Sequence, residues 1–170
     1  MTLRQSGRQS GRHMVKHGLL SVGLALVANQ ALAESPVERL FPDKSGCYVR
    51  NYTAKHLASH PKQRVTGIAV IAEASIADPM IGLWTAVDLR GVPGGSYEAL
   101  AYCEPVSADT LRCGMEGDAG SYTVSPSKDG TILIEVGPYG MSFEGAQGFA
   151  TLESQSGDDR SFILYPAACP

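Results

Sequence analysis

The sequence predicts an all-β fold, either a small antiparallel β-barrel or a two-layer β-sandwich, with about 8–10 strands tied by disulfides. Three observations carry this prediction. Short apolar runs recur over residues 47–165, and several alternate apolar with polar residues, which is the period of a half-buried strand. Glycine, proline and aspartate separate the runs, and the connections are too short for parallel crossovers. The 4 cysteines form an even set, as disulfide-bonded exported domains usually do.

The N-terminal segment, residues 1–33, has the pattern of a cleavable secretory signal peptide. Basic residues without any acidic residue precede an apolar run, and Ala31 and Ala33 then give the small-x-small pattern of a cleavage site. The apolar run is about ten residues, whereas a membrane-spanning helix needs about 20. We therefore expect a bacterial periplasmic or secreted protein with no membrane span after signal cleavage. A second interpretation of residues 1–13 is an over-long gene start, because Met14 directly precedes a better-proportioned leader.

The remaining chain is predicted to be a lead-in segment, residues 34–46, followed by a single β domain, residues 47–170. These parts hold all 17 acidic residues but only 10 of the 14 basic residues, so their net charge is −7 with neutral histidines. Binding of nucleic acid requires clustered Lys and Arg, so this charge balance argues against it. The sequence indicates no cofactor and leaves the oligomeric state open.

The predicted strands follow the apolar runs in chain order. The strongest turn is Asp129-Gly130, which supplies the positive φ values of a type I′ turn and so pairs residues 121–125 with residues 131–136. The one helix expected is Ala54–Ser59, which ends before Pro61. The strands are expected at 47–52, 64–72, 81–90, 96–103, 111–116, 121–125, 131–136, 141–145, 149–153 and 161–165.

The cysteines are predicted to form two disulfides. Of the three pairings that four cysteines allow, we favour Cys103–Cys113, which flanks one short loop, and Cys47–Cys169, which joins the two ends of the domain. A zinc site is the competing interpretation, but the sequence has no CxxC pair.

His56 and His60 are spaced so that two imidazoles on one helical turn could share a metal, as in HExxH zinc enzymes. The glutamate of that motif is missing, and a third ligand would have to be an acid such as Asp78 or Asp88. The pattern therefore favours a structural role, in which the short helix packs Leu57 on the barrel mouth and the histidines are solvated or cap carbonyl groups. No catalytic residue is predicted.

Trp84 is the single tryptophan, and strand alternation puts it on the face opposite the apolar residues of its strand. Two interpretations follow. The favoured one is that Trp84 covers a second small apolar cluster. The other is that it lines an interior cavity or an outer binding face, with Tyr97, Tyr102 and Tyr139 as candidate neighbours in a ligand site.

Three stretches, HLASHPKQRVTGIAV (56–70), CGMEGDAGSYTV (113–124) and GDDRSFILY (157–165), together resemble a family of exported bacterial proteins that has no established function. The resemblance implies a β-rich envelope protein. It also implies recurring polar positions, and we expect Arg64 or Arg160 to fix loops by charge-assisted hydrogen bonds to Asp118 or Asp159. The recurring positions are His56, His60, Arg64, Asp118, Asp158, Asp159 and Arg160.

These observations favour a non-catalytic exported β-barrel that binds a small apolar ligand or an envelope protein. Two alternatives stay open: a metal-assisted hydrolase that uses His56 and His60, and an inhibitor of a cell-wall hydrolase.

Overall fold

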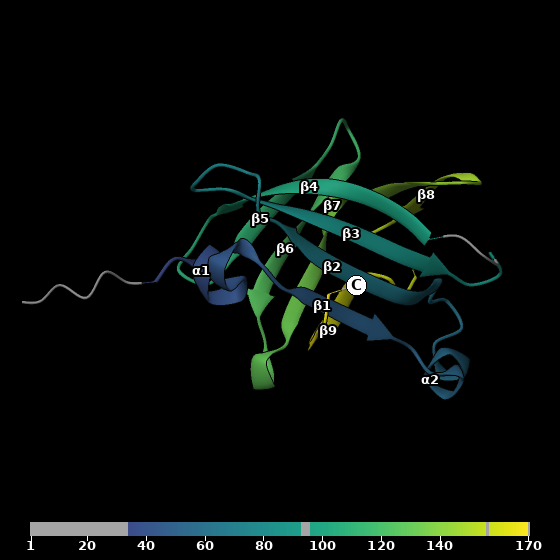
Figure 1. The fold of residues 1–170 in the computed structure, drawn as a ribbon. Helices are drawn as coiled ribbons and strands as arrows, with labels where there is room; N and C mark the ends of the chain where they lie inside the picture. The colour runs from purple at the N-terminus through teal and green to yellow at the C-terminus, as the bar shows by residue number, and fades with distance from the viewer. Residues whose placement is uncertain (1–33, 93–95, 156, 170) are drawn as a thin grey trace, which may run out of the picture. The chain divides into compact units, whose positions relative to one another are not determined.

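The computed structural model describes residues 34–92, 96–155 and 157–169, and the predicted signal peptide lies outside the described residues. Nine strands and four short helical segments make up this part of the chain (Figure 1). In order, they are α1 (Pro36–Leu40), η1 (Pro42–Lys44), β1 (Cys47–Asn51), α2 (Ala54–Ser59), β2 (Val65–Glu73), β3 (Ile81–Leu89), β4 (Ser96–Pro105), β5 (Leu111–Met115), β6 (Gly120–Pro126), η2 (Lys128–Gly130), β7 (Ile132–Gly145), β8 (Gly148–Leu152) and β9 (Ser161–Ala167).

Eight of these strands close into an antiparallel barrel in the order β1-β2-β3-β4-β5-β6-β7-β9, with β9 pairing back onto β1. β8 lies outside the ring and pairs with β7 alone. Of the two predicted architectures, the barrel is therefore the one formed. Closure leaves the eight barrel strands without the unpaired edges that invite aggregation.

β7 corrects the predicted strand list, because the two strands predicted at 131–136 and 141–145 are parts of one strand of 14 residues, Ile132–Gly145. Its first half pairs with β6 and β9, and its second half pairs with β8. Gly137, in the middle of β7, lets β6 come close. A Cβ atom at this position would lie 2.6 Å from the carbonyl oxygen of Ser121, so only glycine allows this approach. The predicted β6–β7 turn is confirmed, since Asp129 and Gly130 both have positive φ and Thr131 N donates to Lys128 O.

The barrel interior is filled with side chains. Tyr122 is fully buried there and its hydroxyl lies 2.8 Å from the Thr85 hydroxyl, so the polar groups of the core satisfy each other. Burial raises the pKa of Tyr122 above its ordinary value. The largest fully buried side chains also include Phe143, Phe162, Ile68, Ile81, Leu83, Leu111, Ile132, Ile134, Met141 and Leu152.

The lead-in segment holds a helix that the sequence analysis missed. Ser35 caps α1 by accepting from Glu38 N, and Pro36 occupies the first turn, which is a favourable start for a helix. Leu40 and Phe41 are buried in the core, and the Tyr48 hydroxyl donates to Leu40 O. The Ser-Pro-Val-Glu stretch at residues 35–38 is the signal in the sequence that indicates this helix start.

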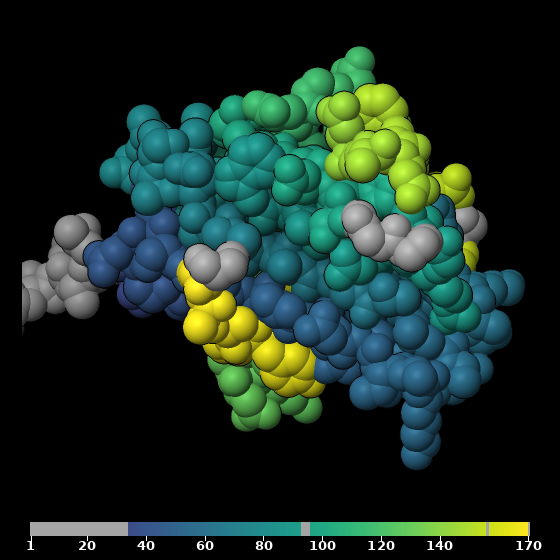
Figure 2. Space-filling view, turned by 45° about the vertical axis from the view of Figure 1, so that its right-hand side comes forward, coloured from purple at the N-terminus to yellow at the C-terminus, as the bar shows by residue number. Residues whose placement is uncertain are grey.

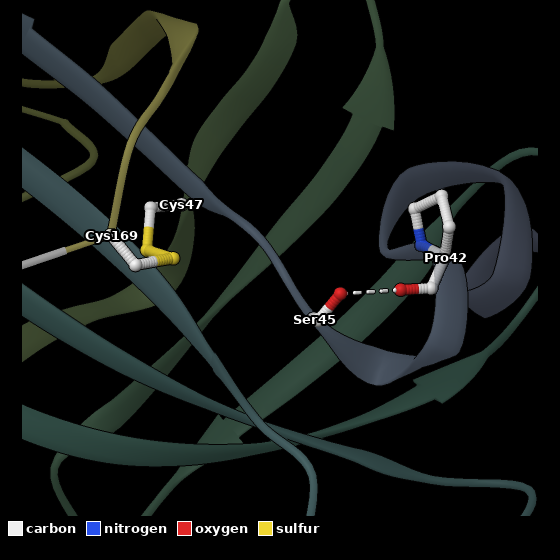
Figure 3. Close-up of a disulfide and its surroundings, with 4 residues drawn as sticks. All are labelled: Pro42, Ser45, Cys47 and Cys169. Atoms are coloured by element: carbon white, nitrogen blue, oxygen red, sulfur yellow. Dashed lines mark hydrogen bonds between the residues drawn. A yellow bond between two sulfur atoms is a disulfide. The ribbon is translucent and has the colours of Figure 1, made fainter.

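Both predicted disulfides are confirmed. Cys47 at the start of β1 bonds to Cys169, which follows β9 (Figure 3). Cys103 and Cys113 are register partners on β4 and β5, and they bond to each other. Two disulfides indicate an oxidising compartment. Within the described ranges, no helix has the length and apolarity that a membrane crossing requires.

Candidate functional site

A groove with a volume of about 560 Å³ lies on the outer wall of the barrel. We call it the acidic groove. In Figure 2, the yellow-green residues around β8 at the upper right lie beside the teal strands β3 and β4, two of the elements that border it. Its lining residues are Trp84, Ser96, Glu98, Ala99, Leu100, Glu116, Ala119, Ser142, Phe143, Glu144, Gly145, Ala146 and Phe149.

The groove exists because the β5–β6 hairpin is shorter than the strands on either side of it. β5 ends at Met115 and β6 begins at Gly120. Beyond this hairpin, β4 and β7 meet directly at one register pair, Glu98 and Glu144. The hairpin tip is tied to both walls, since Ser142 N donates to Ala119 O at 2.7 Å and Glu116 N donates to Leu100 O at 3.0 Å.

The groove carries three carboxylates and no lysine or arginine among its lining residues. Glu98 and Glu144 face each other across the β4–β7 pair, and both are exposed. Like charges directly opposite each other in a sheet destabilise it. Glu116 accepts from the Tyr102 hydroxyl at 2.9 Å, and this hydrogen bond raises the pKa of Tyr102. The site is therefore a concentration of negative charge that a cation would neutralise.

Aromatic side chains flank these carboxylates. Trp84 on β3 is 40% exposed and Phe149 on β8 is 78% exposed. Leu100 is the register partner of Trp84, so the floor beside the indole is apolar. Outside the groove, Glu73 has a lowered pKa, chiefly because its carboxylate accepts from the backbone N–H of Ser75, with a smaller hydrogen-bond contribution from Trp84.

The structure separates the four aromatic residues of the predicted ligand site. Trp84 lies on the outer face, as alternation predicted, and Tyr102 shares that face beside Glu116. Tyr97 points into the core and is 6% exposed. Tyr139 is exposed and lines a different hollow, formed with Thr151 and residues 153–155 among others. Of the four, Trp84 alone is among the residues that line the acidic groove; Tyr97, Tyr102 and Tyr139 are not.

The sequence analysis missed Glu98, Glu116, Glu144 and Phe149. Alternation along β4 does place Glu98 on the same face as Leu100, so one wall was available from the pattern. The opposite wall was not, because Glu144 reaches Glu98 only through the long-range pairing of β4 with β7.

His56 lies on α2, the helix predicted at residues 54–59, and His60 is the residue that caps its C-terminal end. Their rings stack at 4.1 Å with an interplanar angle of 14°, and His56 also stacks on Tyr52 at 4.7 Å. Nitrogen lone pairs lie in the ring plane, so two nearly parallel stacked rings do not aim at a shared ion. His56 Nε2 instead lies 2.9 Å from Gln63 Oε1, and His60 Nδ1 lies 3.0 Å from His56 O.

The acids considered as a third metal ligand are engaged elsewhere. Asp78 pairs with Lys44 at 2.9 Å, and Asp88 accepts from the Ser96 hydroxyl at 2.9 Å. Among the described residues, no group of three or more His, Cys, Asp or Glu side chains is placed to hold a metal ion.

Of the expected pairings of Arg64 or Arg160 with Asp118 or Asp159, the structure contains Arg64 with Asp159, but the donor is the backbone N–H of Arg64 and not its guanidinium. Asp159 is buried and accepts from the backbone N–H groups of Arg64 at 2.7 Å and Val65 at 3.1 Å. The Arg64 guanidinium donates instead to Thr151 O on β8. Backbone amides hold Asp159 because the start of β2 approaches the turn before β9, and this contact fixes the loop as the prediction required.

Asp118, Asp158 and Arg160 take no part in the ion pairs found within the described chain. Those pairs are Arg39–Asp109, Lys44–Asp78 and Arg112–Glu104. Arg160 contributes its backbone carbonyl, which accepts from Val136 N.

No protein-family model matches the chain, and neither a curated protein nor a solved structure was found to be similar to it. Function must therefore be inferred from the chemistry of the acidic groove and not from a relative.

Proposed function

We propose that the protein is a non-catalytic binding protein of the cell envelope, and that its acidic groove binds a basic segment of a partner protein. The observation that carries this proposal is the Glu98–Glu144 pair, two carboxylates set opposite each other in a groove without a basic lining residue. The proposal places the mature protein in the periplasm or outside the cell. The leader pattern and the two disulfides support that location.

The charge of the groove selects a cation. A like-charged pair directly opposite in a sheet costs up to about 1 kcal/mol, and a lysine or arginine side chain between the two carboxylates turns this repulsion into attraction. Glu116 adds a third carboxylate to the same lining. Segments 34–170 as a whole are acidic, with 17 acidic and 10 basic residues, so the wider field also attracts a basic partner.

The apolar part of the groove suits the stem of the same side chain. Lysine and arginine have long aliphatic stems that cover apolar surface while their charged ends contact polar groups. Trp84 and Phe149 supply this surface, and an aromatic face also attracts a cation directly. A partner protein is favoured over a free amine because exposed Phe149 and Tyr102 offer further surface around the groove that only a larger partner would cover.

A ligand inside the barrel is not part of the proposal. The interior positions hold bulky side chains such as Tyr122, Phe143 and Phe162, each at most 2% exposed. We therefore propose a ligand on the outer wall in place of the small apolar ligand expected from the sequence.

Inhibition of a cell-wall hydrolase is a second candidate function, and the charge of the groove favours it. An enzyme that works on an anionic polymer benefits from a basic surface, and such a surface is complementary to Glu98, Glu116 and Glu144.

Fluorescence of Trp84 tests the proposal, because Trp84 is the single tryptophan and lines the groove. The probe is a short, end-blocked peptide of alternating lysine and leucine, and the comparison peptide carries glutamate in place of lysine. We expect saturable change in Trp84 emission with the basic peptide only, weakening as salt rises. Glu98→Gln/Glu144→Gln should weaken binding at least about tenfold, as loss of two facing charges implies.

The matched control is Glu135→Gln, an exposed glutamate of β7 outside the groove, which should leave binding unchanged. Equal responses to both peptides, or no response of Trp84 to either, would overturn the proposal. Spermine is the third arm: binding as tight as that of the peptide would identify a small polyamine as the ligand and contradict a protein partner. Inhibition is tested separately, by measuring whether the protein slows a basic muramidase and whether the double variant relieves that effect.

A further inference from the structure

Arg50 stands apart from the acidic groove and has no role in the function proposed above. It lies on β1 opposite Ile68 of β2, near the point where β1 separates from β9 after the pair Val49–Tyr165. Its neighbour in the strand, Asn51, is the last residue of β1. Arg50 therefore occupies the end of the barrel at which α2 follows β1.

Two tyrosine rings hold its guanidinium. The Cζ atom lies 5.1 Å from the ring centroid of Tyr52 and 5.0 Å from that of Tyr165. Tyr52 continues the stack through His56 to His60. Tyr52 is itself part-buried, and burial raises the pKa of its hydroxyl although Arg50 opposes this effect. The tyrosine is thus a neutral ring and its hydroxyl remains a donor.

The guanidinium has no polar partner in the part of the chain that the structure describes. Its Nε atom is buried without a hydrogen bond, and no carboxylate of the described residues forms an ion pair with Arg50. Asp159, which acts electrostatically on Tyr52, is held by the amides of Arg64 and Val65. A ligand cannot reach the buried Nε, but the Nη atoms also form no hydrogen bond with the described residues, so this edge of the guanidinium has donors free for a further partner.

We propose that Arg50 is the centre of a second binding site, which takes a carboxylate group through the Nη edge of its guanidinium. The rings of Tyr52 and Tyr165 crowd the guanidinium, so a small planar carboxylate at its Nη edge fits better than a bulkier tetrahedral phosphate. A planar fork of N–H donors is the geometry that arginine uses to bind carboxylates, and lysine cannot reproduce it.

The test is an NMR titration of the arginine side-chain resonances of ¹⁵N-labelled mature protein at constant ionic strength. Sodium acetate is the probe, with sodium chloride and inorganic phosphate as comparisons. Acetate should give a saturable shift at Arg50 and at the rings of Tyr52 and Tyr165. Arg50→Lys should weaken acetate binding at least about tenfold, the loss expected for one charge-assisted hydrogen bond. Arg112→Lys, on β5 and paired with Glu104, should bind acetate as the wild type does.

The titration of the wild type decides the proposal even if the Arg50 variant folds poorly. Equal shifts at all arginines, or no saturation at Arg50, would overturn the site. Tighter binding of phosphate than of acetate would overturn the assignment to a carboxylate. The peptide response of Trp84 reports on the acidic groove alone, so either proposal can fail without the other.

Discussion

The disulfide between Cys47 and Cys169 should supply a large part of the stability of the barrel. Its two cysteines are 122 residues apart in the sequence. In the chain-entropy model, closing a loop of this length removes about 4.9 kcal/mol of unfolded-state entropy at 25 °C. The bond between Cys103 and Cys113 closes a separation of 10 residues, for which the same relation gives about 2.7 kcal/mol.

Cys169→Ser isolates this effect. Cys169 is exposed, so the change removes no core packing, while Cys47 stays as a buried thiol. Three register pairs still join β1 to β9, so we expect a folded barrel with an unchanged native spectrum. Urea unfolding followed by Trp84 fluorescence and circular dichroism should show the free energy of unfolding reduced by about 4–5 kcal/mol. A loss below about 1.5 kcal/mol at an unchanged m-value would refute the entropic account of this bond.

Three further substitutions test the packing. Tyr122→Phe leaves the Thr85 hydroxyl unpaired and should cost about 1–3 kcal/mol at neutral pH by urea unfolding. Folding raises the pKa of Tyr122, so its full contribution to the free energy of unfolding is present below the unfolded-state pKa of about 10 and is lost as the pH rises above that value. Between about pH 9 and pH 11, the variant should therefore lose less stability than the wild type. Phe41→Ala should cost about 3–5 kcal/mol, and a loss under about 1 kcal/mol would show that α1 does not complete the core. Gly120→Ala, whose added carbon would meet Gly140 O at 2.1 Å, should lower the thermal midpoint markedly, and an unchanged midpoint would contradict the close β6–β7 approach.

The local part of the fold could be predicted because it depends on neighbouring residues. Alternation placed Trp84 and Asp88 outward on β3, and the Asp129-Gly130 turn set the β6–β7 pairing. Closure into a barrel could not be predicted in the same way. It depends on β9 pairing with both β1 and β7, contacts between segments far apart in the sequence.

The candidate sites show the same limit. The outward position of Glu98 follows from strand period, but its partner Glu144 comes from the point at which a short hairpin lets β4 meet β7. Arg50 drew no attention in the sequence, because its clamp is made by Tyr52 beyond the end of β1 and by Tyr165 on the last strand. Strand register and barrel closure bring together side chains that are far apart in the sequence, and no local sequence pattern indicates such contacts.

Chemical-shift mapping of the labelled protein with the lysine–leucine peptide tests the role of the acidic groove most directly. The predicted result is a set of saturable shifts confined to the Trp84 indole, the backbone of Glu98 and Glu144, and Phe149. Shifts centred on another face of the barrel, such as the His56–His60 stack, or no shifts at concentrations that saturate a weak complex, would contradict it.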